Sequence, residues 1–343
     1  MKAIVIREWS SPQQFPLEDV AEPEPGPGEV LVGVHTVGIV FGDTLIATGR
    51  YQVRPKLPFT PGAECSGVIE AVGPGVTAYK PGDRIAALGF IGDSRENRTI
   101  LGACREKIVV PERNLALVPT GIDLEEAALF RSNMETSYLG LQEGRLQAGE
   151  TLLVLGAGGG TGSAAVALGK ALGARVVASA SSEEKRHIAS QFGADAVVDS
   201  KAADWRQQIE AIVGTRGVDV IYDPVGGEQS ERAFRTLGYR GRFVIIGFAA
   251  GEIPKLPLNL PLLKASSVVG ANLLRAWEHE PQRIADNAQY LLNLFAQGRL
   301  KPPPIAKRYT LDEADKAFRE VADGQTAGRI VMSVGAGTGR GGL

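Results

Sequence analysis

Hydrophobic residues in the first 124 positions fall into short runs separated by turns rich in glycine and proline. These runs occupy residues 3–6, 29–40, 66–72, 83–88 and 106–110. Apolar runs of this length, bounded by turn residues, are typical of β-strands. Their spacing favours a compact, partly open β-barrel over a parallel sheet.

From about Glu125 the pattern changes to apolar runs that alternate with helical or glycine-rich segments. The runs are found at 151–156, 175–180, 196–199, 218–223, 242–248 and 266–271. Six such runs separated by helices predict a six-stranded, doubly wound parallel sheet, so the fold class is α/β. Ser181, with Glu184 three residues later, predicts the start of the helix after the second run.

The last part of the chain contains helices and one more strand. An amphipathic helix is expected over 281–298, a second helix from near Leu311, and a final strand over 328–334 that returns to the first domain. We therefore predict a first domain at 1–124, a second at 125–275 and a return segment at 276–334. The tail 335–343 has almost no apolar content to bury, so we expect it to be flexible.

The composition is that of a globular chain, with 343 residues, 44% hydrophobic and 22% charged, and a formal net charge of −2. This charge gives no electrostatic reason to bind nucleic acid or an anionic membrane. The N-terminal apolar run is too short for a signal peptide, and no segment approaches the roughly 20 apolar residues that span a bilayer. Two cysteines alone, Cys65 and Cys104, favour a reducing cytoplasm.

A glycine-rich segment follows the first apolar run of the predicted parallel sheet. Ala157, Gly159 and Gly162 form the pattern A-x-G-x-x-G between a predicted strand and a predicted helix. Small residues let the backbone approach a pyrophosphate, and the helix N-terminus supplies unpaired N–H groups. The alternative is a glycine turn with only a structural role. The candidate cofactor-binding residues here are Ala157, Gly158, Gly159, Gly160, Thr161 and Gly162.

The end of the second predicted strand indicates which dinucleotide is bound. An NAD site usually places an acid there to hold the ribose hydroxyls, whereas this chain has Ala180. The residues that follow include hydroxyls and cations suited to a 2′-phosphate, namely Ser181, Ser182, Lys185 and Arg186. We therefore predict NADPH as the cofactor. Alternatively, Lys185 and Arg186 belong to an ordinary solvated helix face.

Several motifs, taken together and in order, carry a family resemblance. They are "PFTPGAECSGVIEAVG", "GAGGGTG", "ASSEEKR", "DPVGG" and "AGRIV". The chain resembles the zinc-independent medium-chain dehydrogenases/reductases of the quinone oxidoreductase (zeta-crystallin-like) group. The resemblance implies a GroES-like catalytic domain and a Rossmann cofactor domain. It also implies cofactor contacts from Thr136, Val225, Gly226, Gly247, Phe248 and Asn272.

The same resemblance bears on metal binding. Zinc enzymes of this superfamily carry a histidine where this chain has Ala63 and a cysteine where it has Val40. The region 89–105 lacks the cysteine cluster of a structural zinc site. Zinc needs three or four N, S or O ligands, so we expect no metal. The histidines are scattered, at His35, His187 and His279.

Without a Lewis acid, hydride transfer favours acceptors whose product anion is delocalised, such as quinones and α,β-unsaturated carbonyls. Tyr51 resembles a tyrosine that acts as the proton donor in related enoyl-thioester reductases; alternatively it is an aromatic wall of the pocket. Two further functions stay open, an enoyl-thioester (enoyl-CoA/ACP) reductase and a non-catalytic NADPH-binding protein of the crystallin type. Val268–Leu273 resembles the edge strand through which relatives form homodimers.

Overall fold

The computed structural model describes residues 1–9, 15–51, 54–88, 102–324 and 326–334. The chain divides into two compact units. Unit 1 comprises Met1–Ser132, Ala288–Ala296 and Pro302–Leu343, and unit 2 comprises Asn133–Asn287 and Gln297–Lys301. The α/β class with a GroES-like part and a Rossmann part is confirmed. The predicted tail, residues 52–53 beside Tyr51 and most of the region 89–105 lie outside the described residues.

Unit 2 contains a six-stranded sheet in which every neighbouring pair of strands is parallel, as predicted. The strand order is β10-β9-β8-β11-β12-β13. Because the chain moves outward from β8 in one direction and then returns to β11 on its other side, the order reverses at β8. The strands span Thr151–Leu155 (β8), Arg175–Ala180 (β9), Ala196–Asp199 (β10), Val218–Asp223 (β11), Leu237–Ile245 (β12) and Ser267–Gly270 (β13).

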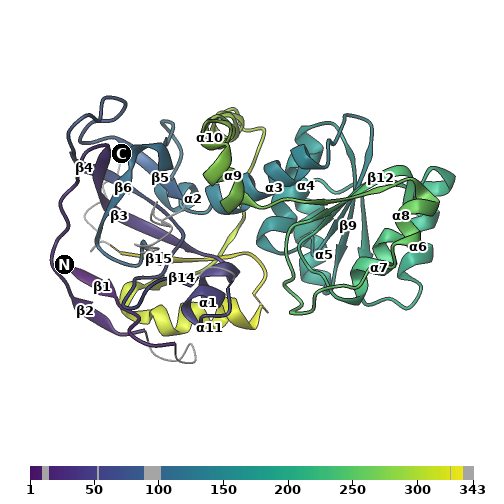
Figure 1. Ribbon diagram of the computed structural model, residues 1–343, viewed down its shortest axis with the longest axis horizontal. Helices are drawn as coiled ribbons and strands as arrows, with labels where there is room; N and C mark the ends of the chain where they lie inside the picture. The colour runs from purple at the N-terminus through teal and green to yellow at the C-terminus, as the bar shows by residue number, and fades with distance from the viewer. Residues whose placement is uncertain (10–14, 52–53, 89–101, 325, 335–343) are drawn as a thin grey trace. The chain divides into compact units, whose positions relative to one another are not determined.

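Helices cover both faces of this sheet (Figure 1). One face carries α4 (Gly160–Ala171) and α5 (Glu183–Gln191). The other carries α6 (Trp205–Val213), α7 (Glu228–Phe234) and α8 (Asn259–Lys264), with the short η2 (Gly214–Arg216) after α6. Under α6 the indole of Trp205 is fully buried, and its Nε1 donates to Ser179 Oγ at 2.8 Å. The two-sided covering explains why these strands are almost continuously apolar.

The start of α5 differs from the prediction by one residue. The N-cap is Ser182, not Ser181, because the Ser182 hydroxyl accepts a hydrogen bond from Lys185 N at 3.3 Å. An N-cap hydroxyl bonds to the N–H two or three residues ahead, and Ser182 does so although the residue three positions later is Lys185 and not the acid of a capping box. The remaining helices of this part of the chain are α3 (Arg131–Glu143), α9 (Leu273–His279) and α10 (Pro281–Ala296).

Unit 1 is built around the long strand β3 (Glu29–Ile39). The main sheet follows the order β14-β15-β3-β4-β5-β7, and β6 also pairs with β3. Apolar side chains such as Val32, Ile69 and Ile85 fill its core. The other strands are β4 (Glu64–Val72), β5 (Arg84–Leu88), β6 (Lys107–Pro111), β7 (Leu115–Leu117), β14 (Ile305–Thr310) and β15 (Arg329–Ser333), with the separate antiparallel pair β1 (Lys2–Ile4) and β2 (Leu17–Asp19).

Short helices complete unit 1. The helix α1 (Phe41–Ala47) packs against α11 (Ala314–Asp323), as Figure 1 shows. The others are α2 (Leu124–Ala127), η1 (Glu112–Asn114) and η3 (Leu311–Glu313). Antiparallel pairing of β15 with β3 joins the C-terminal strand to the barrel. No helix in the described parts of the chain combines the length and the hydrophobicity that a membrane crossing requires.

An ion pair lies inside the barrel. The Glu64 side chain, at the start of β4, is fully buried and pairs with Arg329 of β15 at 2.5 Å. Glu64 Oε2 also accepts from Ser132 N at 2.8 Å. Burial raises the pKa of Glu64, although the Arg329 guanidinium opposes the rise. Because a buried carboxylate without a cation is strongly destabilising, Arg329 is required wherever Glu64 is kept.

A second buried acid joins α1 to the turn before β4. Asp43 is 1% exposed and accepts hydrogen bonds from the N–H groups of Val40, at 2.9 Å, and of Ala63. Burial raises the pKa of Asp43 to about 7, and the nearby Glu64 carboxylate adds to the rise. The two backbone bonds favour the ionised form but do not offset its loss of solvation.

This pKa makes the stability of unit 1 depend on pH. Between about pH 4 and pH 7 folded Asp43 retains a proton that the unfolded chain has lost, so its contribution to stability falls as the pH rises. The Asp43→Asn variant does not titrate. We expect its free energy of unfolding, relative to wild type, to increase by a few kcal/mol from pH 4.5 to pH 7.5.

The measurement is urea unfolding, monitored by circular dichroism, at a series of pH values. Asp312→Asn, at an exposed position of unit 1, is the matched control. Its free energy of unfolding should differ from that of wild type by the same amount at every pH. A difference in the free energy of unfolding between Asp43→Asn and wild type that does not change with pH would contradict the prediction.

Candidate functional site

The turn from β8 into α4 leaves no room for a side chain at Gly156 or Gly162. Gly156, just after β8, has a φ of +60°, a left-handed conformation that favours glycine. A Cβ on Gly162 would lie 2.1 Å from the Gly156 carbonyl oxygen and 2.8 Å from Ala157 Cα. Only glycine allows α4 to begin this close to the end of the strand.

The first amides of α4 are available to a ligand. The helix begins at Gly160, and its first backbone bond closes from Ser163 N to Gly159 O at 2.8 Å. Helix geometry therefore leaves the N–H groups of Gly160, Thr161 and Gly162 without an intrahelical acceptor. These donors and the positive end of the helix dipole suit an anion such as a dinucleotide pyrophosphate. The residues present fit a dinucleotide cofactor.

Two further loops converge on this turn. A Cβ on Gly156 would lie 2.8 Å from Val225 Cγ2, so the loop after β11 contacts the glycine turn. A Cβ on Gly226, whose φ is +74°, would lie 2.9 Å from Phe248 Cδ1, so the loop after β12 joins them. The structure thus brings Val225, Gly226 and Phe248 together with the glycine turn. Gly247 lies in the same region, since a Cβ on Gly247 would lie 3.5 Å from Pro224 O.

Asp223, which the sequence analysis did not identify, shapes the loop after β11. This buried residue accepts from Val225 N at 2.8 Å and Gly226 N at 3.0 Å through one oxygen. Its second oxygen accepts from Ser230 Oγ at 2.5 Å. An acid that ends an apolar run immediately before Pro-Val-Gly-Gly was the available indication in the sequence.

The end of β9 carries no carboxylate. Ala180 is the last residue of the strand and is buried. A Cβ on Gly158 would lie 2.4 Å from Lys185 Cβ, so the first turn of α5 contacts the glycine turn. Arg186 pairs with Asp199, at the end of β10, at 3.2 Å. From the sequence, Arg186 was assigned to a 2′-phosphate or, alternatively, to a solvated helix face, and this acid was not included.

Thr136 and Asn272 lie on helices of unit 2. Thr136 is a half-buried residue of α3, and the neighbouring Ser137 Oγ donates to Thr161 O at 2.8 Å. That bond attaches α3 to the first turn of α4. Asn272 is the N-cap of α9, and its side-chain oxygen accepts from Arg275 N at 3.2 Å. Capping of α9 is enough to explain an asparagine at this position. The predicted contact of Asn272 with the cofactor stays a prediction.

Tyr51 belongs to unit 1. It follows α1, and its backbone N donates to Leu45 O at 3.2 Å. The half-buried ring packs against the barrel core, with Cε2 3.9 Å from the position of a Cβ on Gly42. Tyr51 is therefore held against α1, the helix that Asp43 ties to the Ala63 turn.

The described residues do not fit a zinc site. No three His, Cys, Asp or Glu side chains among them gather as metal ligands would. Both cysteines are buried free thiols. Burial raises the pKa of Cys65 to about 12 and that of Cys104 well above its ordinary value.

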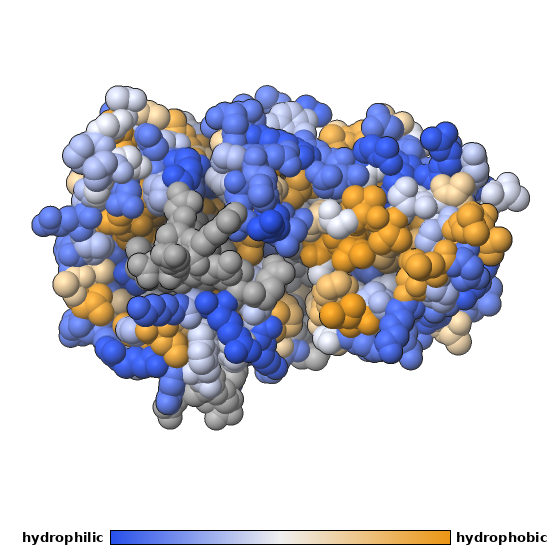
Figure 2. Space-filling model, in the orientation of Figure 1, coloured by the Kyte–Doolittle hydropathy of each residue, from blue (hydrophilic) through white to orange (hydrophobic). Residues whose placement is uncertain are grey.

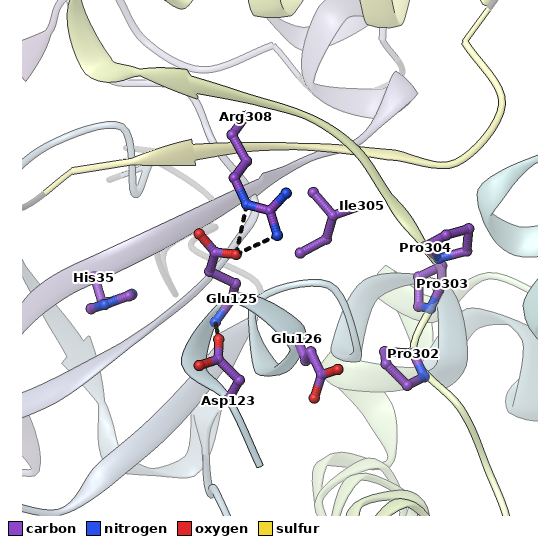
Figure 3. A pocket seen from close by; sticks show the side chains of 9 residues that line it. All are labelled: His35, Asp123, Glu125, Glu126, Pro302, Pro303, Pro304, Ile305 and Arg308. Atoms are coloured by element: carbon purple, nitrogen blue, oxygen red, sulfur yellow. Dashed lines mark hydrogen bonds and ion pairs between the residues drawn. The ribbon is translucent and has the colours of Figure 1, made fainter. Parts of the chain in front are cut away.

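A separate hollow on unit 1 has a different character (Figure 3). The Arg308 guanidinium crosses it to Glu125, with Nε at 2.9 Å and a second nitrogen at 2.8 Å from one carboxylate oxygen. None of the predicted site residues lines it. Its lining consists of His35, Asp123, Glu125, Glu126, Pro302, Pro303, Pro304, Ile305 and Arg308.

Two family models match parts of the chain. The model of the alcohol dehydrogenase GroES-like domain matches residues 26–120, and that of a zinc-binding dehydrogenase matches residues 160–289. A quinone oxidoreductase-like protein 2 homologue of Nematostella vectensis is 33% identical over 338 residues, covering 97% of this chain and 88% of that protein. The quinone oxidoreductase of Pseudomonas aeruginosa is 33% identical over 96% of this chain and 99% of its own.

Among solved structures, the quinone oxidoreductase of Thermus thermophilus, also determined in complex with NADPH, has a TM-score of 0.82. It is 31% identical and covers 97% of this chain and 100% of its own. Identity above 30% over almost the whole length shows the family as well as the fold. The chain belongs to the quinone oxidoreductase family of the medium-chain dehydrogenases/reductases, which are oxidoreductases.

Proposed function

We propose that this protein is an NADPH-dependent oxidoreductase that transfers hydride to a quinone or an α,β-unsaturated carbonyl without zinc. The observation that carries the proposal is the α4 N-terminus, whose first amides face a glycine turn beside a strand end that lacks an acid. The NADPH complex of the Thermus thermophilus relative supports the choice of cofactor.

In this proposal the residues of unit 2 hold the cofactor by its charged groups. The N–H groups of Gly160, Thr161 and Gly162 bind the pyrophosphate. Lys185 and Arg186, with Ser181 and Ser182 nearby, bind the 2′-phosphate. Arg186 does so while paired with Asp199, which orients its guanidinium but also lowers the net positive charge of the site. NADPH, when bound, supplies the hydride.

The absence of a fitting zinc set among the described residues restricts the acceptor. A simple ketone needs a Lewis acid or a strong hydrogen-bond donor to stabilise the developing alkoxide. A quinone or an enone delocalises the charge itself. We therefore propose acceptors of the latter two kinds, in the cytoplasm that the two free cysteines favour.

Tyr51 has two roles under this proposal. As an acid, its phenol protonates the reduced acceptor; as a wall, its ring stacks on the acceptor. An acid role favours the alternative function of an enoyl-thioester reductase, because an enolate is more basic than a hydroquinone anion. A chain that binds NADPH and turns over no acceptor would be the third possibility, a crystallin-type binding protein.

We also propose that the protein is a homodimer formed through β13. This strand is the last in its sheet, and its outer edge pairs with no strand in the described part of the chain. Figure 2 shows hydrophobic residues gathered on the visible face of unit 2. Leu258, Leu262 and Leu263, just before β13, are 83%, 80% and 76% exposed. Exposed leucines and an open sheet edge are each typical of surfaces that a partner covers.

The first prediction about function concerns cofactor preference. We expect NADPH to bind more tightly than NADH, and Lys185→Ala and Arg186→Ala each to weaken NADPH by about 10- to 100-fold while leaving NADH nearly unchanged. Asp199→Asn, which frees Arg186, should strengthen NADPH. The measurement is the Kd of each dinucleotide by fluorescence titration at fixed moderate salt.

Lys201→Ala is the matched control, because Lys201 is an exposed cation just after β10. It should change neither Kd. Tighter binding of NADH by the wild type would contradict the assignment of the 2′-phosphate site.

The acceptor is tested by NADPH oxidation with a quinone, an enone and an enoyl-CoA, each with and without a chelator. We expect turnover of the quinone and the enone, and no effect of the chelator. Tyr51→Phe keeps the ring and removes the proton. If Tyr51 serves as the acid, Tyr51→Phe should lower kcat with enoyl-CoA by about 10²–10⁴-fold. The loss of kcat with the quinone should be much smaller.

Equal kcat for Tyr51→Phe and wild type with every acceptor would leave the tyrosine as a wall of the pocket. Turnover abolished by the chelator would overturn zinc independence. Tight NADPH binding without turnover of any acceptor would favour the non-catalytic function.

The homodimer predicts a mass in solution twice that of the chain, by light scattering after gel filtration. Leu262→Lys combined with Leu263→Lys places two cations in the interface and should yield monomers. Leu117→Lys, at a position that is 43% exposed on β7 of unit 1, should stay dimeric. A monomeric wild type would refute the proposed interface.

A further inference from the structure

One buried side chain next to the glycine turn lacks a hydrogen-bond partner. Asn133, near the start of α3, is 6% exposed, and its Nδ2 has no partner among the described residues. Buried amide donors are almost always paired, so an unpaired one needs an explanation. The mechanism described above does not use this residue.

The position of this amide is close to the first residue of α4. A Cβ on Gly160 would lie 2.7 Å from Asn133 Nδ2 and 3.0 Å from its Oδ1. One helical turn further along α3, Ser137 Oγ donates to Thr161 O at 2.8 Å. The carboxamide is thus held against the α4 N-terminus by a second contact between the same two helices.

Several hydrogen-bond donors meet at this point. The amides of Gly160, Thr161 and Gly162 have no intrahelical acceptor, and Asn133 adds a neutral N–H₂ group beside them. A ligand that satisfies several donors at once must present several acceptor oxygens. A pyrophosphate does so, and its negative charge also matches the helix dipole.

We propose that Asn133 is a cofactor-positioning residue that donates a hydrogen bond to the pyrophosphate of the bound dinucleotide. This inference rests on the proposed function, because it assumes that a dinucleotide binds at the α4 N-terminus. It adds a side-chain contact from α3 to the backbone contacts of the glycine turn.

The inference also explains a glycine. Gly160 has an ordinary helical place, and the A-x-G-x-x-G pattern does not require glycine there. A Cβ at residue 160 would displace the Asn133 carboxamide, since both of its polar atoms lie within 3.0 Å of that position. Glycine at 160 and asparagine at 133 therefore depend on each other.

The test compares Asn133→Ala and Asn133→Asp with wild type by isothermal titration with three ligands. NADPH and 2′-phospho-ADP-ribose contain the pyrophosphate, whereas adenosine 2′-monophosphate lacks it. We expect Asn133→Ala to weaken the first two by about 10- to 100-fold and to leave the third unchanged. Asn133→Asp should weaken them further, because its carboxylate repels the phosphates.

Two further variants sharpen the comparison. Gly160→Ala should show the same ligand pattern as Asn133→Ala, and the two changes combined should cost less than the sum of the separate losses. Gln147→Ala, at an exposed position after α3, is the control and should bind all three ligands as wild type does.

Unchanged affinity of Asn133→Ala for NADPH, in a wild type that binds it, would overturn this inference alone. An equal loss for all three ligands, together with a lower melting temperature of the ligand-free protein, would also overturn it, since that pattern marks a structural role. Wild type that binds no NADPH would refute the proposed function and this inference with it.

Discussion

The close approach of α4 to the end of β8 is the constraint on which the cofactor side of this protein depends. The Gly156 carbonyl lies where a side chain at residue 162 would have to be, so the helix begins almost at the strand end. Its first amides then face outward beside the loops after β11 and β12. Asp223 fixes the first of those loops through two backbone amides. The rest of the site is arranged around this contact.

Unit 1 relies instead on buried charges. In zinc enzymes of the superfamily, by resemblance, the positions of Val40 and Ala63 carry metal ligands. Here Asp43 accepts hydrogen bonds from the backbone N–H groups of both residues. The Asp43 carboxyl group therefore holds the turn and α1 together through these two backbone hydrogen bonds. Glu64 and Arg329, paired nearby, connect this corner to the C-terminal strand.

The sequence predicted the strands, helices and turns whose residue pattern lies within one short segment of the chain. Most strands of the parallel sheet are apolar runs because both faces of the sheet are covered, and the glycine turn is a contiguous motif. The short strands β2 and β7 and the seven-residue helix α1 were missed because they are too brief for periodicity to show. Helix α3 was missed because its sequence, RSNMETSYLGLQE, is largely polar.

The same division applies to the candidate site. Ala180 and the glycines could be predicted from the residues beside them. The pairing of Arg186 with Asp199, the two bonds of Asp223 and the contact of Asn133 with Gly160 join separate segments. The contact between Gly158 and Lys185 has a consequence for protein engineering. The Lys185 side chain covers Gly158, so a larger residue at 158 would displace the cation proposed to bind the 2′-phosphate. The pyrophosphate site and the 2′-phosphate site therefore cannot be redesigned independently.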